Sequence, residues 1–325
     1  MTTRAVPGET KSASKTESAP QSYQLELRGR VVLLATDGSP AAQAATRMAP
    51  ALAARHHALV HAVRVIDTRP APIPPSLDLG LAMADATTGD AVQERQVRDL
   101  RDAIASTIGQ PCDWPVRVLL GTPAREIVKE ATRLGAALVI LGLRRHGRLD
   151  RAIHDETVLS VMQTSGCPVL GVAQEAADLP TRVLAALDFS VASQEAARAA
   201  CGVMGAKGSI VLAYVSPPMD YLPGDGESVI HELGVKAGFE RCAAELARPG
   251  VSVDHVVLHH ELSHTVANVL LEYADGVHID LIAAGSGRHN RVERWMLGSV
   301  STDIVRDGHR SVLIVPQRGA PGQGG

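Results

Sequence analysis

The sequence predicts an α/β protein with two tandem, doubly wound domains, each built on a parallel five-stranded sheet. Three segments recur in the same order about 150 residues apart, which is one ordinary domain length. VVLLATDGSP at 31–40 returns as RVLAALDFSV at 182–191, ALVILGLRRHGR at 137–148 as DLIAAGSGRHNR at 280–291, and GCPVLGVA at 166–173 as HRSVLIVP at 309–316. Within each copy, short apolar runs alternate with longer helical stretches, which is the pattern of β-α-β units.

Composition sets the expected domain boundaries. Residues 1–28 are polar with little to bury and lack the apolar core of a secretory signal, so a disordered lead is expected. Residues 29–174 form the first copy and 181–317 the second, followed by a flexible Gly/Pro-rich tail at 318–325. No run approaches the about 20 apolar residues of a membrane span, so a soluble, cytoplasmic protein is expected.

The expected elements of the first copy follow from its apolar runs and helix signals. Thr122 is a candidate helix cap, Pro123 suits a first turn, and Gly135 is a left-handed stop. Strands are expected at 31–35, 58–65, 116–120, 137–141 and 169–172, and helices at 41–55, 91–108 and 123–134.

The second copy repeats this order. Strands are expected at 183–186, 210–215, 251–258, 281–284 and 312–315. One helix is expected to begin near residue 193, a second to end near residue 247, and two more to span 265–273 and 292–306.

Charge and composition exclude several classes of partner. The formal net charge of −3 and the 2% aromatic content argue against binding of nucleic acid or of an anionic membrane. The four cysteines are widely spaced without a C-x-x-C pair, so they are expected to be reduced thiols rather than disulfides or zinc ligands.

In a doubly wound sheet, ligands bind beyond the carboxyl ends of the strands. The residues to consider therefore follow the first, second and fourth strands of each copy. In the first copy these are Thr36, Asp37, Val65 and Gly142, and in the second Leu187, Asp188, Val215 and Gly285.

Both copies resemble universal stress protein domains. The resemblance rests on A-x-D-x-S at 35–39, G-T-P-A at 121–124, C-P-V-L at 167–170 and L-G-S-V at 297–300, and it covers nearly all of residues 30–316. It implies an adenine-nucleotide-binding, Rossmann-like (HUP) fold that binds ATP together with Mg²⁺. In the nucleotide-binding members, the loop that holds the ATP has the motif G-x-x-G, followed after nine residues by G-S or G-T. It also implies that the Asp after the first strand bonds the ribose and that the residue after the second strand flanks the adenine.

The glycine loop has a physical rationale, because glycines let the backbone approach phosphates while exposed amides and a helix N-terminus attract negative charge. The implied site in the second copy comprises Leu187, Asp188, Val215, Gly285, Arg288, Gly298, Ser299 and Val300. A weaker counterpart in the first copy comprises Thr36, Asp37, Val65 and Gly142.

Each copy departs from the family pattern. Arg288 stands where the second glycine of the second copy belongs, and it either blocks the phosphate pocket or binds phosphate through its two-pronged guanidinium. In the first copy Arg145 replaces that glycine, and Asp155 and Glu156 replace Gly-Ser. Two carboxylates at a phosphate position repel phosphate, so we expect the first copy to be nucleotide-blind. An alternative for Asp37 and Asp188 is a purely structural role at the helix start.

Other motifs predict no further chemistry. GSGRHN at 285–290 follows the fourth strand of its copy and lacks the downstream acid of a dinucleotide fingerprint. His255, His259, His260 and His264 lack a recognisable ligand pattern, so no metal site is expected. No catalytic residue is assigned, and slow ATP hydrolysis stays open.

Two functions remain. In the first, the chain is a stress-response regulator that binds ATP in the second copy. In the second, the chain is a nucleotide-independent scaffold protein of the stress response. Both functions require a regulatory protein partner, which the sequence does not identify. Resemblance to the family implies dimerisation through last strands, so we expect strands 169–172 and 312–315 to pair as an internal pseudo-dimer. Further homo-oligomerisation stays open.

Overall fold

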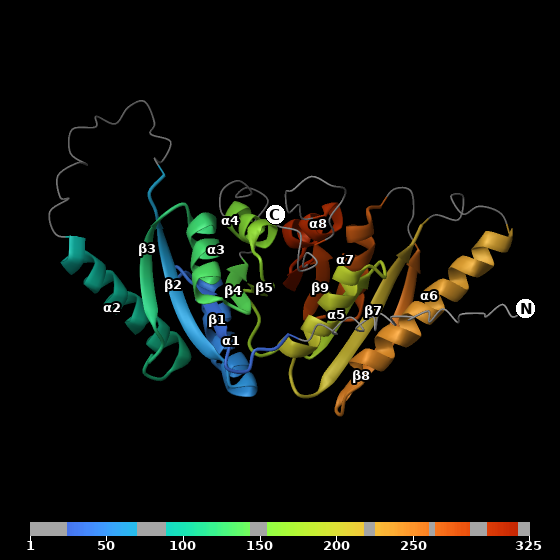
Figure 1. Ribbon diagram of the computed structural model, residues 1–325, viewed down its shortest axis with the longest axis horizontal. Coiled ribbons are helices and arrows are strands. Elements are labelled where there is room, and N and C mark those ends of the chain that lie inside the picture. The colour runs from blue at the N-terminus through green and yellow to red at the C-terminus, as the bar shows by residue number, and fades with distance from the viewer. Residues whose placement is uncertain are drawn as a thin grey trace, which may run out of the picture.

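The computed structural model describes residues 25–69, 89–143, 155–217, 225–259, 264–286 and 298–317 (Figure 1). Within these residues the strands join into one ten-stranded sheet, in the order β3-β2-β1-β4-β5-β10-β9-β6-β7-β8. Each copy contributes five adjacent strands that run parallel to one another. The predicted α/β class and its parallel sheets are confirmed.

The elements of the first copy follow the predicted order. The strands are β1 (Val31–Ala35), β2 (Leu59–Asp67), β3 (Val116–Gly121), β4 (Leu138–Leu143) and β5 (Val169–Ala173). The helices are α1 (Pro40–His56), α2 (Gly89–Ile108), α3 (Pro123–Leu134) and α4 (Asp155–Thr164). Gly135 ends α3 in the left-handed conformation at φ 57°, as predicted, whereas Thr122 occupies the cap position of α3 without a side-chain bond.

The second copy repeats these elements. Its strands are β6 (Arg182–Leu187), β7 (Gly208–Ser216), β8 (Val251–His259), β9 (Leu281–Ser286) and β10 (Ser311–Pro316). Its helices are α5 (Val191–Val203), α6 (Asp225–Leu246), α7 (Val266–Gly276) and α8 (Ser299–Asp307). The first part of the helix expected at 292–306 lies outside the described residues.

Four strands are longer at their carboxyl ends than expected. Val65 pairs with Leu119 inside β2, and Gly142 pairs with Val172 inside β4. Val215 and Gly285 likewise lie inside β7 and β9. Gly142 and Gly285, which were expected to follow their strands, therefore lie within them, and Val65 and Val215 are no longer the last residues of theirs. Pairing with a neighbouring strand extends each strand.

An antiparallel seam joins the two copies. β5 and β10 pair with Val312 opposite Gly171, Leu313 opposite Leu170 and Ile314 opposite Val169. The predicted pairing of the two last strands is confirmed. It makes one sheet of two copies, drawn in Figure 1 with the first copy in blue to green and the second in yellow to red.

Helices cover both faces of this sheet. One core holds buried side chains of α1, α2, α5 and α6, and the other holds those of α3, α4, α7 and α8. Each core contains residues of both copies, so the seam is buried on its two sides. No helix of the described ranges is both long and apolar enough to cross a membrane.

Residues before the first strand belong to the first of these cores. Leu25 is 7% exposed and Leu27 is 1% exposed, and both pack in the core under α1 and α5. The prediction of a disordered lead over residues 1–28 is therefore wrong for its last residues. Leu25 and Leu27, two apolar residues in an otherwise polar segment, are buried in the core.

Candidate functional site

The same turn follows the first strand of each copy. Asp37 accepts a hydrogen bond at Oδ1 from the Ser39 amide, and Asp188 accepts one at Oδ1 from the Ser190 amide, each at 2.9 Å. Ser39 and Ser190 then cap α1 and α5. The structural role considered for the two aspartates is thus present: each carboxylate closes the turn that positions the capping serine.

The middle residue of this turn differs between the copies. Gly38 has φ 78°, and Phe189 occupies the corresponding position with φ 60°. A left-handed backbone is costly for a bulky residue, so the surrounding packing must hold Phe189 in place. Its ring lies 5.3 Å from the rings of both Tyr214 and Phe239, centroid to centroid.

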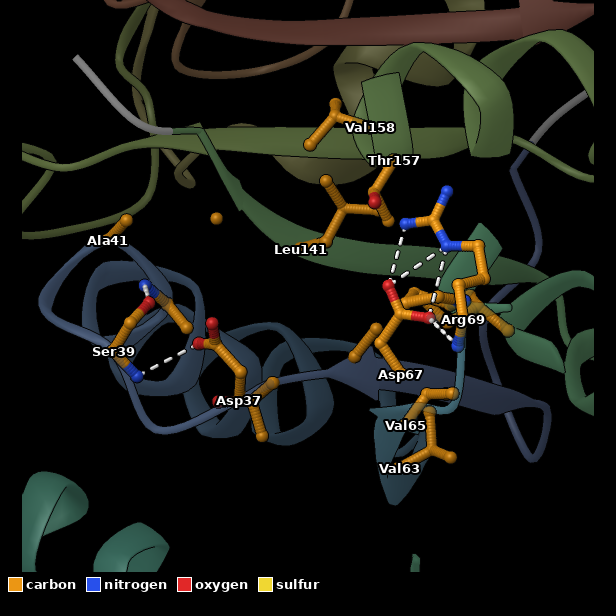
Figure 2. A pocket seen from close by; sticks show the side chains of 16 residues that line it. Asp37, Ser39, Ala41, Val63, Val65, Asp67, Arg69, Leu141, Thr157 and Val158 are labelled. Atoms are coloured by element: carbon orange, nitrogen blue, oxygen red, sulfur yellow. Dashed lines mark hydrogen bonds and ion pairs between the residues drawn. The ribbon is translucent and has the colours of Figure 1, made fainter. Parts of the chain in front are cut away.

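A cavity of about 280 Å³ opens beside this turn in the first copy (Figure 2). All four sequence-predicted residues of this copy, Thr36, Asp37, Val65 and Gly142, line it together. Apolar side chains also line it, namely Val63, Ile127, Leu141 and Val158. The cavity therefore combines an apolar floor with polar groups at its edge, which is the usual make-up of a small-molecule site.

An ion pair at the edge of this cavity was not anticipated from the sequence. Arg69 reaches the Asp67 carboxylate from Nη2 at 2.7 Å and from Nε at 3.0 Å, and both residues line the cavity (Figure 2). The hydrogen bonds from Arg69 lower the pKa of Asp67. The D-x-R spacing was the available signal, but Asp67 reaches the cavity only because β2 continues to that residue.

The first glycine of each predicted loop has a packing role. A Cβ on Gly142 would lie 2.2 Å from the carbonyl oxygen of Ala41, and a Cβ on Gly285 would lie 2.5 Å from the carbonyl carbon of Ala192. These glycines let the first turns of α1 and α5 press against β4 and β9. The sequence predicted that these glycines let the backbone approach phosphates, and helix packing already requires them.

In the second copy, the N-terminus of α8 lies against the end of β9. Ser301 Oγ donates a hydrogen bond to the carbonyl oxygen of Gly285 at 3.2 Å. Gly298 is the N-cap, has no side chain to bond the helix amides, and no acidic residue stands in the first turn. Ser299 is exposed and Val300 half-buried, so the first amides of α8 are presented at this edge of the sheet.

The corresponding helix start in the first copy is acidic. Gly142 and Gly285 are 143 residues apart (285 less 142), and the same interval takes Asp155 to Gly298 and Val158 to Ser301. α4 begins at Asp155, and Glu156 is exposed. Arg145 and Arg288, at the second glycine of each loop, lie outside the described residues.

Asp188 carries the negative charge of the second site. Burial acts to raise its pKa, but hydrogen bonds from Ser190 and Ser193 outweigh that effect and hold the pKa below its ordinary value. Val215, half-buried, belongs to the same sheet face as α7 and α8. Leu187 is 5% exposed and belongs to the opposite core, so only its backbone is available to a ligand.

Two of the histidines that the sequence places near one another in the second copy contact other side chains. His255 packs on Phe239 with 4.7 Å between ring centroids, and His264 Nε2 lies 3.7 Å from a Glu272 carboxylate oxygen. Within the described part of the chain, no three His, Cys, Asp or Glu side chains are grouped to hold a metal ion. His260 is outside that part.

Comparison with known proteins agrees with the duplication. The model of the universal stress protein family matches residues 29–173 and again residues 180–316. Universal stress protein MJ0531 of Methanocaldococcus jannaschii is 25% identical over 145 residues, which are 43% of this chain and 80% of that protein.

Two solved structures span both copies. A universal stress protein from Archaeoglobus fulgidus DSM 4304 is similar with a TM-score of 0.60 and 18% identity, over 89% of this chain and 98% of that one. A functionally unknown protein from Pseudomonas aeruginosa PAO1 is similar with a TM-score of 0.55 and 13% identity, over 88% and 92%. At these identities the likeness shows the shared tandem fold.

Proposed function

We propose, from the premise that this chain belongs to the universal stress protein family, that it is a stress-response regulator whose second copy binds an adenine nucleotide such as ATP. The observation that carries the proposal is the start of α8. It has a glycine N-cap and an acid-free first turn, and Ser301 fixes it to the end of β9.

The phosphates are assigned to this helix start. The first amides of an α-helix have no partner inside the helix, and the helix dipole places partial positive charge there. Both features favour an anion with oxygen acceptors, and Ser299 adds an exposed hydroxyl. Mg²⁺ bound with ATP would be held mainly by the phosphates, as is usual for this ion.

The nucleoside is assigned to the neighbouring strand ends. β6 pairs directly with β9, so the turn that holds Asp188 adjoins the carboxyl end of the strand that contains Gly285. An ionised Asp188 offers acceptors for the ribose hydroxyls, and Val215 offers an apolar surface for the base.

The first copy is proposed to be the nucleotide-blind partner. Asp155 and Glu156 stand at the positions of Gly298 and Ser299, at the start of α4. These charges repel phosphate at short range. The proposal assigns binding and regulation to the chain and no catalytic step.

Calorimetric titration of ATP tests the assignment. The variant Gly298→Asp with Ser299→Glu imports the acidic pair of the first copy; a Cβ at Gly298 meets no atom within 4 Å, so the fold accommodates it. The matched control is Asp155→Gly with Glu156→Ser. We expect about one nucleotide per chain, lost in the first variant. The control keeps the nucleotide of the second copy, and any second nucleotide that it gains is bound by the first copy, whose acidic pair it removes. Binding that survives in the first variant would place the nucleotide elsewhere.

An interaction scaffold is the second candidate. α6 exposes three apolar side chains, Val229, Ile230 and Leu233, which are 56%, 71% and 61% exposed. Exposed apolar surface of this kind favours protein contacts. Absence of heat and of any thermal shift at millimolar ATP would support this function over the first.

A further inference from the structure

The cavity of the first copy has the make-up of a binding site, although the proposed function assigns it no ligand. Its volume is about 280 Å³, just below the roughly 300–1,000 Å³ that is usual for small-molecule sites. Its floor is formed by the buried side chains of Val63, Ile127, Leu141 and Val158. Covering an apolar floor that faces water is favourable, so the cavity suits a small ligand with an apolar body.

Two oxygen acceptors at the rim of this cavity have capacity for a ligand. Asp37 Oδ1 accepts a hydrogen bond from the Ser39 amide, whereas no residue of the described ranges donates to Oδ2. Thr36 is 6% exposed, and its Oγ1 accepts from the Gly38 amide at 3.2 Å, which uses one of its two lone pairs. Both side chains line the cavity, so they offer acceptors to a ligand that carries N–H groups.

The backbone donors beside these oxygens already have acceptors. The amides of Gly38 and Ser39 donate to Thr36 and Asp37. The amide of Ala42, in the first turn of α1, donates to the carbonyl oxygen of Ser39 at 3.0 Å. These three amides are therefore not available to bind an anion.

The charge around the cavity is negative in total. Asp67 and Arg69 neutralise each other, and Figure 2 shows this pair across Leu141 from Asp37. The pKa of Arg69 is raised by its hydrogen bonds to Asp67 and further by the charge of Glu156, in the first turn of α4. Asp37 itself forms no ion pair with any residue that the structure describes. Its carboxylate is thus the point at which the rim attracts a positive charge.

We propose that this cavity binds a small organic cation, with its apolar body on the floor and its ammonium group at Asp37 and Thr36. An ammonium group carries three N–H donors and no acceptor, so it matches the free oxygens and the charge of this rim. The site differs from the one proposed at α8, whose first turn is free of acids and is assigned to phosphate. The two copies thus bind ligands of opposite charge, and neither assignment rests on the other.

The probes are phenethylammonium, 2-phenylethanol and phenylacetate, which share one apolar body and differ in charge. Each is titrated into the full chain at neutral pH and constant ionic strength, with calorimetry and melting temperature as readouts. We expect phenethylammonium to bind saturably in the millimolar range, about one per chain, as suits so small a ligand. The alcohol should bind roughly tenfold more weakly because it lacks the charge, and phenylacetate should not bind.

Two variants locate the cation. Asp37→Asn keeps an acceptor for the Ser39 amide and removes the charge, so the chain should fold and bind phenethylammonium about tenfold more weakly. Asp113→Asn removes an exposed carboxylate of the same copy that does not line the cavity, and it should leave the affinity unchanged.

The comparison of the three probes needs no variant, so the proposal is falsifiable with the wild-type chain alone. Equal affinities for the ammonium and the alcohol, or no binding of the ammonium at millimolar concentration, overturn it. Binding of phenylacetate instead would assign the cavity to anions through Arg69 and would also overturn it. An affinity for phenethylammonium that Asp37→Asn leaves unchanged would show that the cation binds elsewhere.

Discussion

His56 donates a hydrogen bond from Nε2 to the carbonyl oxygen of Gly202, 2.6 Å away, and so ties the last residue of α1 to α5 of the other copy. The antiparallel pair of β5 and β10 joins the same two copies within the sheet. Hydrogen bonds therefore join the two copies both in the sheet and in a helical layer. A ligand that stabilises one copy should also affect the stability of the other.

The pH dependence of stability should report on His56. Burial lowers its pKa, the bond to Gly202 raises it, and Arg55 and Arg248 lower it, with a net lowering. Its contribution to stability is thus complete above the unfolded pKa of about 6.5 and is lost as pH falls toward the lowered folded value. We therefore expect the free energy of unfolding, measured by urea denaturation, to fall more for the wild type than for His56→Gln when the pH is lowered from about 7.5 to about 5.5.

The control for this experiment is His309→Gln, which changes an exposed histidine. It should lose stability on acidification as the wild type does. Equal losses for His56→Gln and the wild type would mean that His56 does not titrate differently in the folded chain.

Gly238 on α6 should be intolerant of a methyl group. A Cβ there would lie 2.6 Å from the ring of Phe189, whereas a Cβ at Gly234, one turn earlier, meets nothing within 4 Å. Gly238→Ala should destabilise the chain by about 1–3 kcal/mol through overpacking. Gly234→Ala should stabilise it by roughly 0.5–1 kcal/mol through helix propensity. Chemical denaturation of the pair measures both, and equal effects would contradict the role given to Phe189.

Gly285 and Gly298 should separate packing from ligand binding. Gly285→Ala places a Cβ against the backbone of Ala192, so it should lower the melting temperature with or without nucleotide. Gly298→Ala meets no atom, so it should leave the melting temperature within a few degrees of wild type. A Gly285→Ala chain of unchanged melting temperature would restore a purely phosphate-related role for this glycine.

Asp188 and Asp37 should differ in their effect on nucleotide affinity. Asp188→Asn removes the charge that Ser190 and Ser193 stabilise, and the loss of charge-assisted bonds to ribose should weaken ATP binding about tenfold or more. Asp37→Asn makes the same change in the first copy and should leave the affinity unaltered. Calorimetry of both variants measures this, and an effect confined to Asp37→Asn would reverse the assignment of the copies.

The sequence was most informative where local pattern and repetition coincide. The order of elements and the grouping of Thr36, Asp37, Val65 and Gly142 around one cavity were predictable from these patterns, and the pairing of the last strands from the resemblance to the family. The first two depend on apolar runs and on the residues at strand ends, which can be identified in short stretches of sequence.

Features that depend on tertiary packing were missed. Asp67 and Arg69 reach the cavity of the first copy because pairing with β3 lengthens β2. Alignment of Gly38 with Phe189 was an available signal for the strained turn and its aromatic neighbours. This signal is visible only when the two copies are aligned, because neither copy alone shows that a glycine position is occupied by phenylalanine.

Photo-crosslinking with 8-azido-ATP, followed by peptide mapping, tests most directly whether the nucleotide binds in the second copy. The azide sits on the base, so the label should fall on the peptide that contains Val215 and be competed by unlabelled ATP. Label on the peptide that contains Val65 and Asp67 would contradict the account, because it would place the base in the copy whose helix start is acidic.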